Sequence, residues 1–548
     1  MRGTTRTVAV AGISAAALLL AGCGGGGEEE TPDASSAKAG GDISVEGCSP
    51  QNPLIPSNTS ETCGGNVLDL VTAKLVSYAT KDAKPEMDIA ESITTSDNQN
   101  FEVKLKKGYK FHDGTEVKAK NFVDAWNYAS YFPNGQGASY FFTPFEGYAD
   151  LQSEDPDEDG PQKAPAPKAK ELSGLKVVDD HTFTIKTSEK VSNLPVRLGY
   201  TAFAPLPDSF FADPEAYGKK PIGAGPYEFV SLTPDVDIKL KKFADYSGKD
   251  AAKPDNITFK IYADDETAYK DLIAGTIDVM EQVPTSALIG EAWKTDLQGR
   301  AATKAVAGIT HVGFTKTDPR LSNVKVRQAI SMAVNRQEIT DKIFNKGRVP
   351  ATGWVPPGID GYAAGACGEA CTFDAAKAKT TLAEGGGFTG TLEFAYNNDG
   401  GHKEWVEATC NQIKTNTGIN CVPRPFVDFS TMLKELESRK FNGMFRLGWQ
   451  MDYPSIENFL APLYGTDADS NYQDYSSPAF DKLLNDAAAD GDPASSNSKY
   501  QEAEKLLGQD LPTMPMWYTA RQTGWSDKVN TVEVDAFGVP DYGNVTLK

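Results

Sequence analysis

The spacing of hydrophobic residues along the chain alternates between two periods, one typical of strands and one typical of helices. Phe101 to Leu105 alternates apolar and polar residues, as expected of a half-buried strand. Ala119 to Ala129 instead places Phe122, Ala125, Trp126 and Ala129 at helical spacing. This alternation predicts a mixed α/β fold. Further strands are predicted at 391–397, 420–427 and 441–449 and in a tail from about 512 to 548, and further helices at 324–334, 403–415 and 480–488.

The N-terminal residues have the pattern of an export signal. Arg2 and Arg6 precede an apolar run from Val8 to Leu20, about 13 residues, which is too short to span a bilayer but fits the core of a signal peptide. The run ends in Leu-Ala-Gly-Cys23, which resembles the lipobox of bacterial lipoproteins. We therefore predict a lipoprotein signal peptide over residues 1–22 and lipidation of Cys23. The alternative is an ordinary secretory cleavage in which Cys23 has no role.

The segment behind Cys23 lacks any apolar periodicity. Residues 23–42 are rich in Gly, Glu, Pro, Ser and Ala, and this composition predicts a flexible tether. No second apolar run of membrane-spanning length follows, so the lipid is expected to be the membrane anchor. The predicted location is the extracytoplasmic face of a bacterial cell membrane, with some protein possible in released form.

Length and charge narrow the classes of function. The chain has 548 residues, which suggests three or four units at about 150 residues per domain. Its formal net charge is −21, so phosphate backbones and anionic lipid head groups would repel it. We therefore expect no nucleic acid partner.

Six cysteines follow Cys23, an even number that suggests disulfides in an oxidising compartment. Fifteen connectivities are possible. The cysteines fall into three pairs that are local in sequence, and local pairing would close short loops rather than join domains. Zinc is the alternative for the closest pair, but no His or Cys cluster completes four ligands, and we predict no metal or cofactor. The three pairs are Cys48 with Cys63, Cys367 with Cys371, and Cys410 with Cys421.

Several motifs together resemble the solute-binding lipoproteins of ABC importers, specifically the large peptide/nickel-binding family and its oligopeptide-binding type. The motifs occur in the order found in that family and cover the chain from about residue 43 to 548. Each motif alone would be weak evidence, but together, behind a lipobox, they identify the chain as a member of the family. The motifs are Phe101–Thr115, Pro221–Tyr227, Tyr269–Asp278, Val326–Arg336, Gly448–Pro454 and Ser477–Leu483.

The resemblance implies a periplasmic-binding-protein-like bilobal cleft fold with an additional third lobe, which closes on its ligand by hinge motion. Lobe I would combine residues 43–76, 192–303 and 507–548. The extra lobe II would span 77–191, and lobe III would span 304–506.

Taken by themselves, two of these motifs are structural rather than catalytic. His112-Asp-Gly114 is interpreted as a turn in which Gly114 can take a positive φ, and no serine or cysteine nucleophile motif accompanies the His–Asp pair. Gly223-Ala-Gly225 gives a tight bend but lacks the third glycine and the following helix of a dinucleotide site. We therefore expect no enzyme activity. A secreted hydrolase that uses two carboxylates is the alternative from another class of function.

The segment Gly448-Trp-Gln-Met-Asp-Tyr453 follows a predicted strand and supplies the first candidate site residues. In the oligopeptide-binding relatives that it resembles, the aspartate matching Asp452 pairs with the α-ammonium of the ligand. Trp449 would form a flat cleft wall, whereas Tyr453 and Gly448 are weaker candidates. The structural alternatives are a turn cap for Asp452 and core packing for Trp449.

Arg446 and His402 match positions that the peptide-binding relatives use near the C-terminal carboxylate of the ligand. An arginine fork suits that carboxylate, but a nearby position where the family can have arginine holds Glu437, with Arg439 two residues later. Carboxylate capture is therefore open. A solvated turn is the alternative for His402. Asn66, followed by Val67 and Leu68, resembles the family's segment at the hinge side of the cleft, with core packing as the alternative.

The resemblance implies a receptor that captures oligopeptides and delivers them to the permease and ATPase subunits of an ABC importer. We expect a monomer. Within the same family the ligand could instead be a nickel–chelator complex, haem, a siderophore or an oligosaccharide. Four dispersed histidines argue against direct metal ligation, and Asp452 argues for an amine.

Overall fold

The computed structural model describes residues 40–548, except residues 60, 155–159, 250–251, 399–400, 428 and 469. The predicted signal peptide over residues 1–22, the predicted lipidation site Cys23 and most of the tether over residues 23–42 lie outside the described residues. Strands and helices alternate along the described chain, which confirms the predicted mixed α/β class.

One large sheet of eleven strands carries most of the strand residues. Its order is β15-β14-β16-β12-β17-β11-β1-β10-β9-β8, and β13 pairs with β17. Parallel pairing joins β14 to β15 and β1 to β10, whereas β12 and β17 pair antiparallel. The strands are β1 (Asp42–Gly47), β8 (Tyr227–Thr233), β9 (Asp237–Lys242), β10 (Asn256–Ile261), β11 (Val279–Met280), β12 (Ala301–Phe314), β13 (Val349–Pro350), β14 (Thr391–Asn397), β15 (Asn420–Phe426), β16 (Met444–Gln450) and β17 (Thr513–Trp525).

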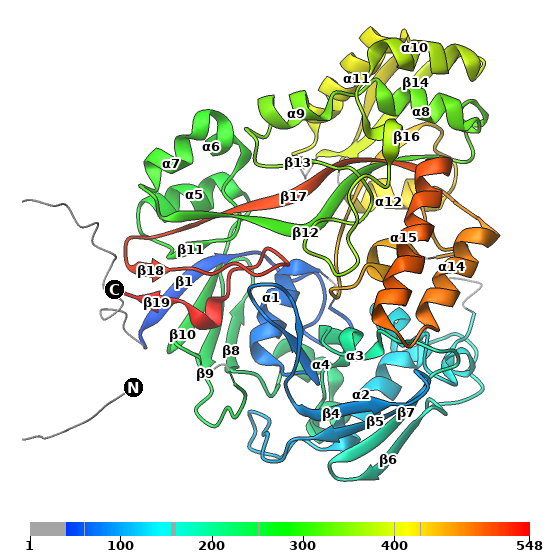
Figure 1. Ribbon diagram of the computed structural model, residues 1–548. Coiled ribbons are helices and arrows are strands. Elements are labelled where there is room, and N and C mark those ends of the chain that lie inside the picture. The colour runs from blue at the N-terminus through cyan, green and yellow to red at the C-terminus, as the bar shows by residue number, and fades with distance from the viewer. Residues whose placement is uncertain are drawn as a thin grey trace, which may run out of the picture. The chain divides into compact units, whose positions relative to one another are not determined.

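The two longest strands, β12 and β17, lie side by side and connect the two halves of this sheet (Figure 1). Their pairing runs from Ala301 opposite Gly524 to Gly313 opposite Thr513, with a register shift between Ala305 and Ile309. At the shift, the Ala307 amide donates to Ala536 O (2.9 Å), and Ala307 O accepts from the Met451 amide (3.1 Å). The shift therefore ties the end of β16 to the C-terminal tail.

A separate sheet of four strands is covered by helix α2 (Ala119–Ser130). On α2, Phe122 stacks on Phe183 with ring centroids 5.8 Å apart, and Trp126 meets the same ring edge-on at 5.5 Å. This arrangement confirms the predicted strand at 101–105 and the predicted helix at 119–129. The strands, in sheet order, are β4 (Ala90–Thr95), β5 (Asn100–Leu105), β7 (Thr182–Lys186) and β6 (Leu175–Asp179).

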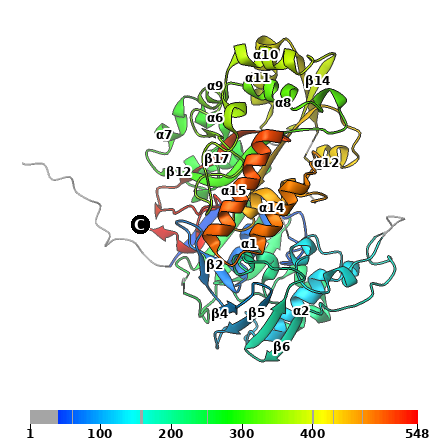
Figure 2. The same cartoon turned by 45° about the vertical axis from the view of Figure 1, so that its right-hand side comes forward.

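Two further pairs of short strands and the remaining helices complete the described chain. Helices α14 and α15 lie side by side in both views (Figures 1 and 2). None of the described helices combines the length and apolar character needed to cross a bilayer. The strand pairs are β2 (Val76–Tyr78) with β3 (Pro85–Met87) and β18 (Val529–Thr531) with β19 (Thr546–Leu547). The α-helices are α1 (Thr62–Val71), α3 (Leu194–Arg197), α4 (Pro214–Lys219), α5 (Asp265–Ile273), α6 (Thr285–Leu288), α7 (Ala292–Asp296), α8 (Val324–Met332), α9 (Arg336–Lys342), α10 (Ala375–Glu384), α11 (Lys403–Thr417), α12 (Phe429–Glu437), α13 (Glu457–Tyr464), α14 (Pro478–Ala488) and α15 (Pro493–Asp510). The 3₁₀ helices are η1 (Phe132–Asn134), η2 (Ser139–Phe142), η3 (Tyr148–Leu151), η4 (Thr201–Phe203), η5 (Asp208–Ala212), η6 (Ile289–Glu291), η7 (Pro319–Leu321), η8 (Gly368–Cys371) and η10 (Tyr542–Asn544).

The two structural motifs of the sequence analysis pack against each other and against the end of α1. His112 Nε2 lies 3.1 Å from Gly225 O, and the Gly223 amide donates to His112 Nδ1 (3.3 Å). A Cβ atom at Gly223 would lie 2.0 Å from Val71 O, so this approach requires glycine. Gly114 has a φ of 85°, which confirms the predicted turn. Both motifs therefore help to position α1.

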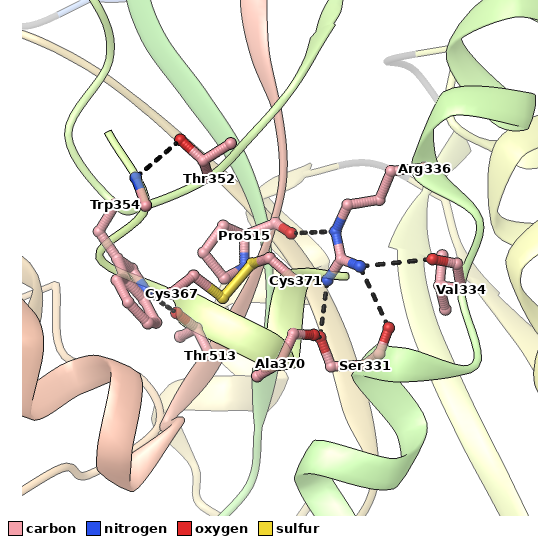
Figure 3. The surroundings of a disulfide bond; sticks show 12 residues. Ser331, Val334, Arg336, Thr352, Trp354, Cys367, Ala370, Cys371, Thr513 and Pro515 are labelled. Atoms are coloured by element: carbon pink, nitrogen blue, oxygen red, sulfur yellow. Dashed lines mark hydrogen bonds between the residues drawn. A yellow bond between two sulfur atoms is a disulfide. The ribbon is translucent and has the colours of Figure 1, made fainter. Parts of the chain in front are cut away.

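Three disulfides join the cysteines that are paired by sequence proximity: Cys48–Cys63, Cys367–Cys371 and Cys410–Cys421. The second bond uses both thiols that zinc would have needed. Figure 3 shows it beside the buried Arg336, which donates to Pro515 O on β17 (2.6 Å) and to Ser331 Oγ (2.7 Å). Ser331 in turn donates to Ala370 O, next to Cys371 (2.6 Å). Arg336 and Ser331 therefore link the loop that this disulfide closes to the long strand β17.

Candidate ligand-binding site

A cavity of about 450 Å³ lies where α1, β2, the end of β16 and the C-terminal tail meet. We call it the acidic cavity, because six acidic side chains and one basic side chain line it. Five aromatic residues also line it. The acidic residues are Glu61, Asp69, Asp88, Asp452, Asp535 and Asp541, the basic residue is Lys74, and the aromatic residues are Tyr78, Tyr200, Tyr246, Phe537 and Tyr542.

Asp452 lines the acidic cavity directly after β16. Its amide donates to Asn458 Oδ1 (2.8 Å), and its Oδ2 accepts from Asn458 Nδ2 (3.0 Å). Within the described residues, its Oδ1 accepts no hydrogen bond. Burial, joined by the charge of Glu457, raises the pKa of Asp452 to about 6, while the bond from Asn458 opposes the rise. A carboxylate held in this way can accept a hydrogen bond from a cationic ligand.

Two tyrosines lie close to Asp452 in the wall of the acidic cavity. Burial and then the charge of Asp452 raise the pKa of both Tyr78 and Tyr200 well above the ordinary value, and Asp69 adds to the rise. Tyr78 donates to Val196 O (2.7 Å), and its ring lies 5.5 Å from that of Phe537. The two hydroxyls therefore stay protonated, and that of Tyr78, whose hydrogen is donated to Val196 O, can serve a ligand as an acceptor.

Asn66 also lines the acidic cavity, on α1. Its Nδ2 donates to Glu281 Oε2 (2.9 Å), and Glu281 forms an ion pair with Arg521 of β17. Val67 and Leu68, which follow it, are fully buried in the core. The amide of Asn66 is therefore bound to the sheet, and its neighbours have the packing role that was the alternative for this segment.

Three other candidates lie near Asp452 but do not line the acidic cavity. Trp449 is half-buried and donates from Nε1 to Asn458 Oδ1 (3.2 Å), the same oxygen that accepts from the Asp452 amide. Tyr453 is buried and donates to Glu457 Oε2 (2.7 Å). Gly448 is exposed in β16 opposite Thr310 of β12. Asn458 thus links Trp449 to Asp452.

Arg446 and His402 form, with Arg348, a second group that we call the basic region. Arg446 donates to Asn397 Oδ1 (3.0 Å), and its guanidinium lies 5.6 Å from the ring centroid of Phe429. His402 Nδ1 accepts from Trp405 Nε1 (3.2 Å). Burial and the charges of the two arginines lower the pKa of His402 to about 2, so it is neutral at pH 7. Arg446 therefore lies close enough to His402 for its charge to act on the imidazole.

Glu437 stands near a position where the family can have arginine, so the sequence left open whether the protein binds a ligand carboxylate here. Glu437 is the last residue of helix α12, and its side chain is exposed. Arg439 pairs with Asp474 (2.9 Å). The arginine next to Glu437 therefore already has a carboxylate partner within the protein.

The acidic cavity also contains residues that the sequence analysis did not select, chiefly Asp69, Asp535, Tyr78 and Phe537. Asp69 lies three residues after Asn66 on α1, so helical spacing could have indicated it. The residues of the tail gave no such signal, because the register shift of β12 brings them to this place.

A comparison with known proteins gives the family. Residues 84–471 match the model described as "Bacterial extracellular solute-binding proteins, family 5 Middle". The chain is 26% identical over 462 residues to the periplasmic oligopeptide-binding protein OppA of Salmonella typhimurium, covering 82% of each chain. It is 24% identical over 481 residues to the di/tripeptide-binding protein 1 of Pseudomonas aeruginosa, covering 84% of this chain and 85% of that protein.

A comparison with solved structures supports the same fold. The structure of Haemophilus influenzae OppA in complex with RPPGFSPFR superposes with a TM-score of 0.75 at 20% identity, covering 93% of this chain and all of that one. This likeness confirms the predicted periplasmic-binding-protein-like fold. Since the family model covers more than half of the sequence, the chain belongs to family 5 of the bacterial extracellular solute-binding proteins.

Proposed function

We propose that this protein is the lipid-anchored extracytoplasmic receptor of an ABC importer, and that it binds oligopeptides and delivers them to the permease and ATPase subunits. Membership of a solute-binding family agrees with the expectation that the protein binds its ligand without chemical conversion. The named peptide-binding relatives support a peptide as the ligand. The observation that carries the proposal is Asp452, whose carboxylate lines a cavity and keeps one oxygen available.

Asp452 would receive the α-ammonium of the peptide. A charge-assisted hydrogen bond of this kind contributes about 1.5–3 kcal/mol. Asn458 orients the carboxylate from the other side, and the same residue holds Trp449, which would form a wall against a ligand side chain. Gly448 and Tyr453, the neighbours of these two residues, would shape the cleft.

The basic region would receive the C-terminal carboxylate. An arginine fork matches carboxylate geometry, and the neutral His402 can donate from one ring nitrogen while the other accepts from Trp405. Glu437 is exposed, so it would act on a ligand carboxylate through solvent.

Closure around the ligand would use the three lobes expected from the family. In this proposal β12 and β17 are the connecting strands, because they pair with both halves of the large sheet and lie close to the expected boundaries at 303/304 and 506/507. The boundaries of lobes I, II and III stay a proposal.

Calorimetric titration of RPPGFSPFR and of short peptides into the purified protein tests the function. Free-amine peptides should bind, and Asp452→Asn should weaken them by about 1.5–3 kcal/mol, because a charge-assisted bond becomes a neutral one. N-acetylation should weaken binding to the wild type but add little to the loss in Asp452→Asn. Asp527→Asn, an exposed aspartate outside the cavity, is the matched control.

Two results would contradict the proposal. If acetylated and free peptides bind equally well, Asp452 has a structural role. If no peptide binds, the ligand is another solute of this family, and mass spectrometry of ligand that co-purifies with the protein would separate nickel–chelator, haem, siderophore and oligosaccharide.

The anchor is tested separately. Cys23→Ser should give a folded protein that is released into the medium, because the acceptor of the lipid is lost. Equal membrane retention of variant and wild type would refute lipidation at Cys23.

A further inference from the structure

Asp452 is held in place by a buried residue that does not itself line the acidic cavity. Asn458 is 1% exposed, donates to Asp452 Oδ2 (3.0 Å) and accepts from the Asp452 amide (2.8 Å). The same oxygen of Asn458 accepts from Trp449 Nε1 (3.2 Å). Asn458 is the second residue of α13. The position of the first turn of this helix therefore determines where the carboxylate of Asp452 lies.

The first residue of α13, Glu457, is bound by a segment that is distant in the sequence. Its Oε2 accepts from Asn193 Nδ2 (3.1 Å) and lies 3.2 Å from Arg197 Nη2. The Tyr453 hydroxyl donates to the same oxygen (2.7 Å). The side chains of Arg197 and Glu457 are only 15% and 8% exposed. Since a buried charge is costly without a partner, each member of this ion pair holds the other in place.

Tyr453 reaches across the same contact between distant segments. The guanidinium carbon of Arg197 lies 5.3 Å from the centroid of the Tyr453 ring. This ring is buried in a hydrophobic cluster whose other buried members belong to residues 55–224. The Ser192 amide donates to Ala488 O (3.0 Å) and adds a backbone contact. The stretch of chain that follows β16 is therefore docked on the first half of the protein.

Arg197 also connects to another part of the acidic cavity. It is the last residue of α3, and residues 199–201, which follow it, line the cavity. Within α3, Val196 O accepts from the hydroxyl of Tyr78, which lines the cavity too (2.7 Å). The ion pair therefore lies between the side of the cavity that contains Tyr78 and the side that contains Asp452. Loss of the ion pair would allow these two sides to shift relative to each other.

This ion pair is better suited to fixing geometry than to adding stability. Removing two charges from water costs about as much free energy as their attraction returns, so a buried pair adds little net stability. Its geometry is nevertheless strict, because one oxygen of Glu457 binds Asn193 and Arg197 on one side and Tyr453 on the other. A shift of either side would break several of these contacts at once. The contact therefore has one favoured position, on which the position of Asp452 depends.

We propose that Arg197 is a positioning residue for the amine of the peptide. Its ion pair with Glu457 joins two sides of the acidic cavity, and Asn458 transmits the resulting position of α13 to the carboxylate of Asp452. By the boundaries expected from the family, Arg197 belongs to lobe I and Glu457 to lobe III, so the pair would bridge the two main lobes. The inference rests on the proposed function, because it assumes that Asp452 binds a peptide amine.

The test measures how much of the affinity depends on the amine. An alanine pentapeptide with a free amine and its N-acetylated form are titrated calorimetrically into the full-length protein and its variants at pH 7.5. The wild type should bind the free-amine peptide at least about tenfold more tightly, as a charge-assisted hydrogen bond allows. This ratio of the two affinities is called the amine ratio below.

Variants assign the effect to the ion pair. Glu457→Gln removes the negative charge but keeps an acceptor for Tyr453 and Asn193. Arg197→Met/Glu457→Gln removes both charges, so it leaves the net charge of the protein unchanged. Each variant should reduce the amine ratio to about threefold or less, while the acetylated peptide stays within about twofold of its wild-type affinity. Arg197→Lys keeps a cation beside Glu457 and should retain an amine ratio of about fivefold or more.

The outcomes separate this inference from the proposed function. The control Asp318→Asn/Arg320→Met removes another ion pair (2.6 Å) whose members do not line the acidic cavity, and it should keep the wild-type amine ratio. An amine ratio that stays at the wild-type value in Glu457→Gln or in Arg197→Met/Glu457→Gln overturns the inference and leaves peptide binding intact. An equal loss of affinity for both peptides also overturns it, because the ion pair then only supports the fold. If the wild type binds no peptide, or binds both forms equally, the proposed function fails and the inference fails with it.

Discussion

The acidic cavity and the basic region share one short stretch of chain, yet they differ in how their polar groups are used. Arg446 lies on β16 and Asp452 directly after it, six residues apart. In the acidic cavity, Asp452 keeps one carboxylate oxygen that accepts no hydrogen bond from the described residues. In the basic region, Arg446 uses Nη1 to donate to Asn397 and its guanidinium lies 5.6 Å from the ring centroid of Phe429, while His402 uses Nδ1 to accept from Trp405.

This difference has a consequence for recognition. A cation can enter the acidic cavity and form hydrogen bonds without displacing a protein group. A carboxylate that approaches Nη1 of Arg446 must instead share this group with Asn397 or replace it. We therefore expect the amine end of a peptide to contribute more binding free energy than the carboxylate end, which would let the protein accept peptides of several lengths.

The disulfides give the largest expected effect, because one serves each region. Cys48–Cys63 fixes the start of α1, which carries Asn66 and Asp69, whereas Cys410–Cys421 ties α11, which begins directly after His402, to β15. Replacing either pair by alanine should lower the free energy of unfolding by about 3 kcal/mol, as loops of 11–15 residues predict. Chemical denaturation measures this loss, and mild reduction should lower the melting temperature in the same way.

The two disulfide variants should differ in peptide affinity. Loss of Cys48–Cys63 loosens one wall of the acidic cavity and should weaken peptide binding, while loss of Cys410–Cys421 should leave it nearly unchanged. The opposite ranking would contradict the greater importance of the acidic cavity. Peptide mapping without reduction checks the connectivity, since a bond from Cys48 or Cys63 to any of the other four cysteines would refute local pairing.

The spacing of hydrophobic residues predicted which helices and strands form better than it predicted where they begin and end. The strand predicted at 391–397 is β14, but the one predicted at 441–449 begins at Met444. Gly443 has a φ of 146°, and a Cβ there would lie 2.5 Å from Glu393 O, so the chain bends before the strand. The predicted strand-rich tail contains one long strand, β17, followed by turns and two short strands. Packing between distant segments sets these ends.

The candidate site could be predicted only in part, because packing between distant segments also determines which residues line it. Asp452 follows a strand within a recognisable motif, so the sequence indicated it. Asp535 lies in a tail turn, and its place beside Asp452 depends on the register shift of β12, which the pattern of apolar residues does not encode. The sequence motif therefore indicated the part of the cavity at the end of β16 and missed the part formed by the tail.

Acidification should have the next largest effect, because it should lower the affinity of the acidic cavity for the peptide amine. The pKa of Asp452 is about 6 in the free protein, and an ammonium ligand would lower it, since the ligand favours the ionised form. Affinity should therefore fall about tenfold per pH unit below pH 6, as protons compete with the ligand.

This pH dependence distinguishes the two regions. Glu457, whose charge contributes to the raised pKa of Asp452, forms an ion pair with Arg197 (3.2 Å). His402, with a pKa of about 2, stays neutral and adds no positive charge for a carboxylate. Titrations with an all-alanine peptide from pH 5 to 7.5 measure the slope. Affinity that rises toward pH 5 would assign the pH dependence to the basic region instead.

The smallest expected effect belongs to Arg446. Arg446→Gln should weaken an all-alanine peptide with a free carboxylate by about 1 kcal/mol, roughly fivefold, since the fork is lost but the amine end remains bound. The same peptide with a C-terminal amide should bind wild type and variant alike. Arg424→Gln is the matched control, because this arginine of β15 pairs with Glu393 (2.7 Å) and not with a ligand. A loss of affinity as large as that in Asp452→Asn would show that both ends of the peptide contribute equally to binding. The expectation that the amine end contributes more binding free energy would then be wrong.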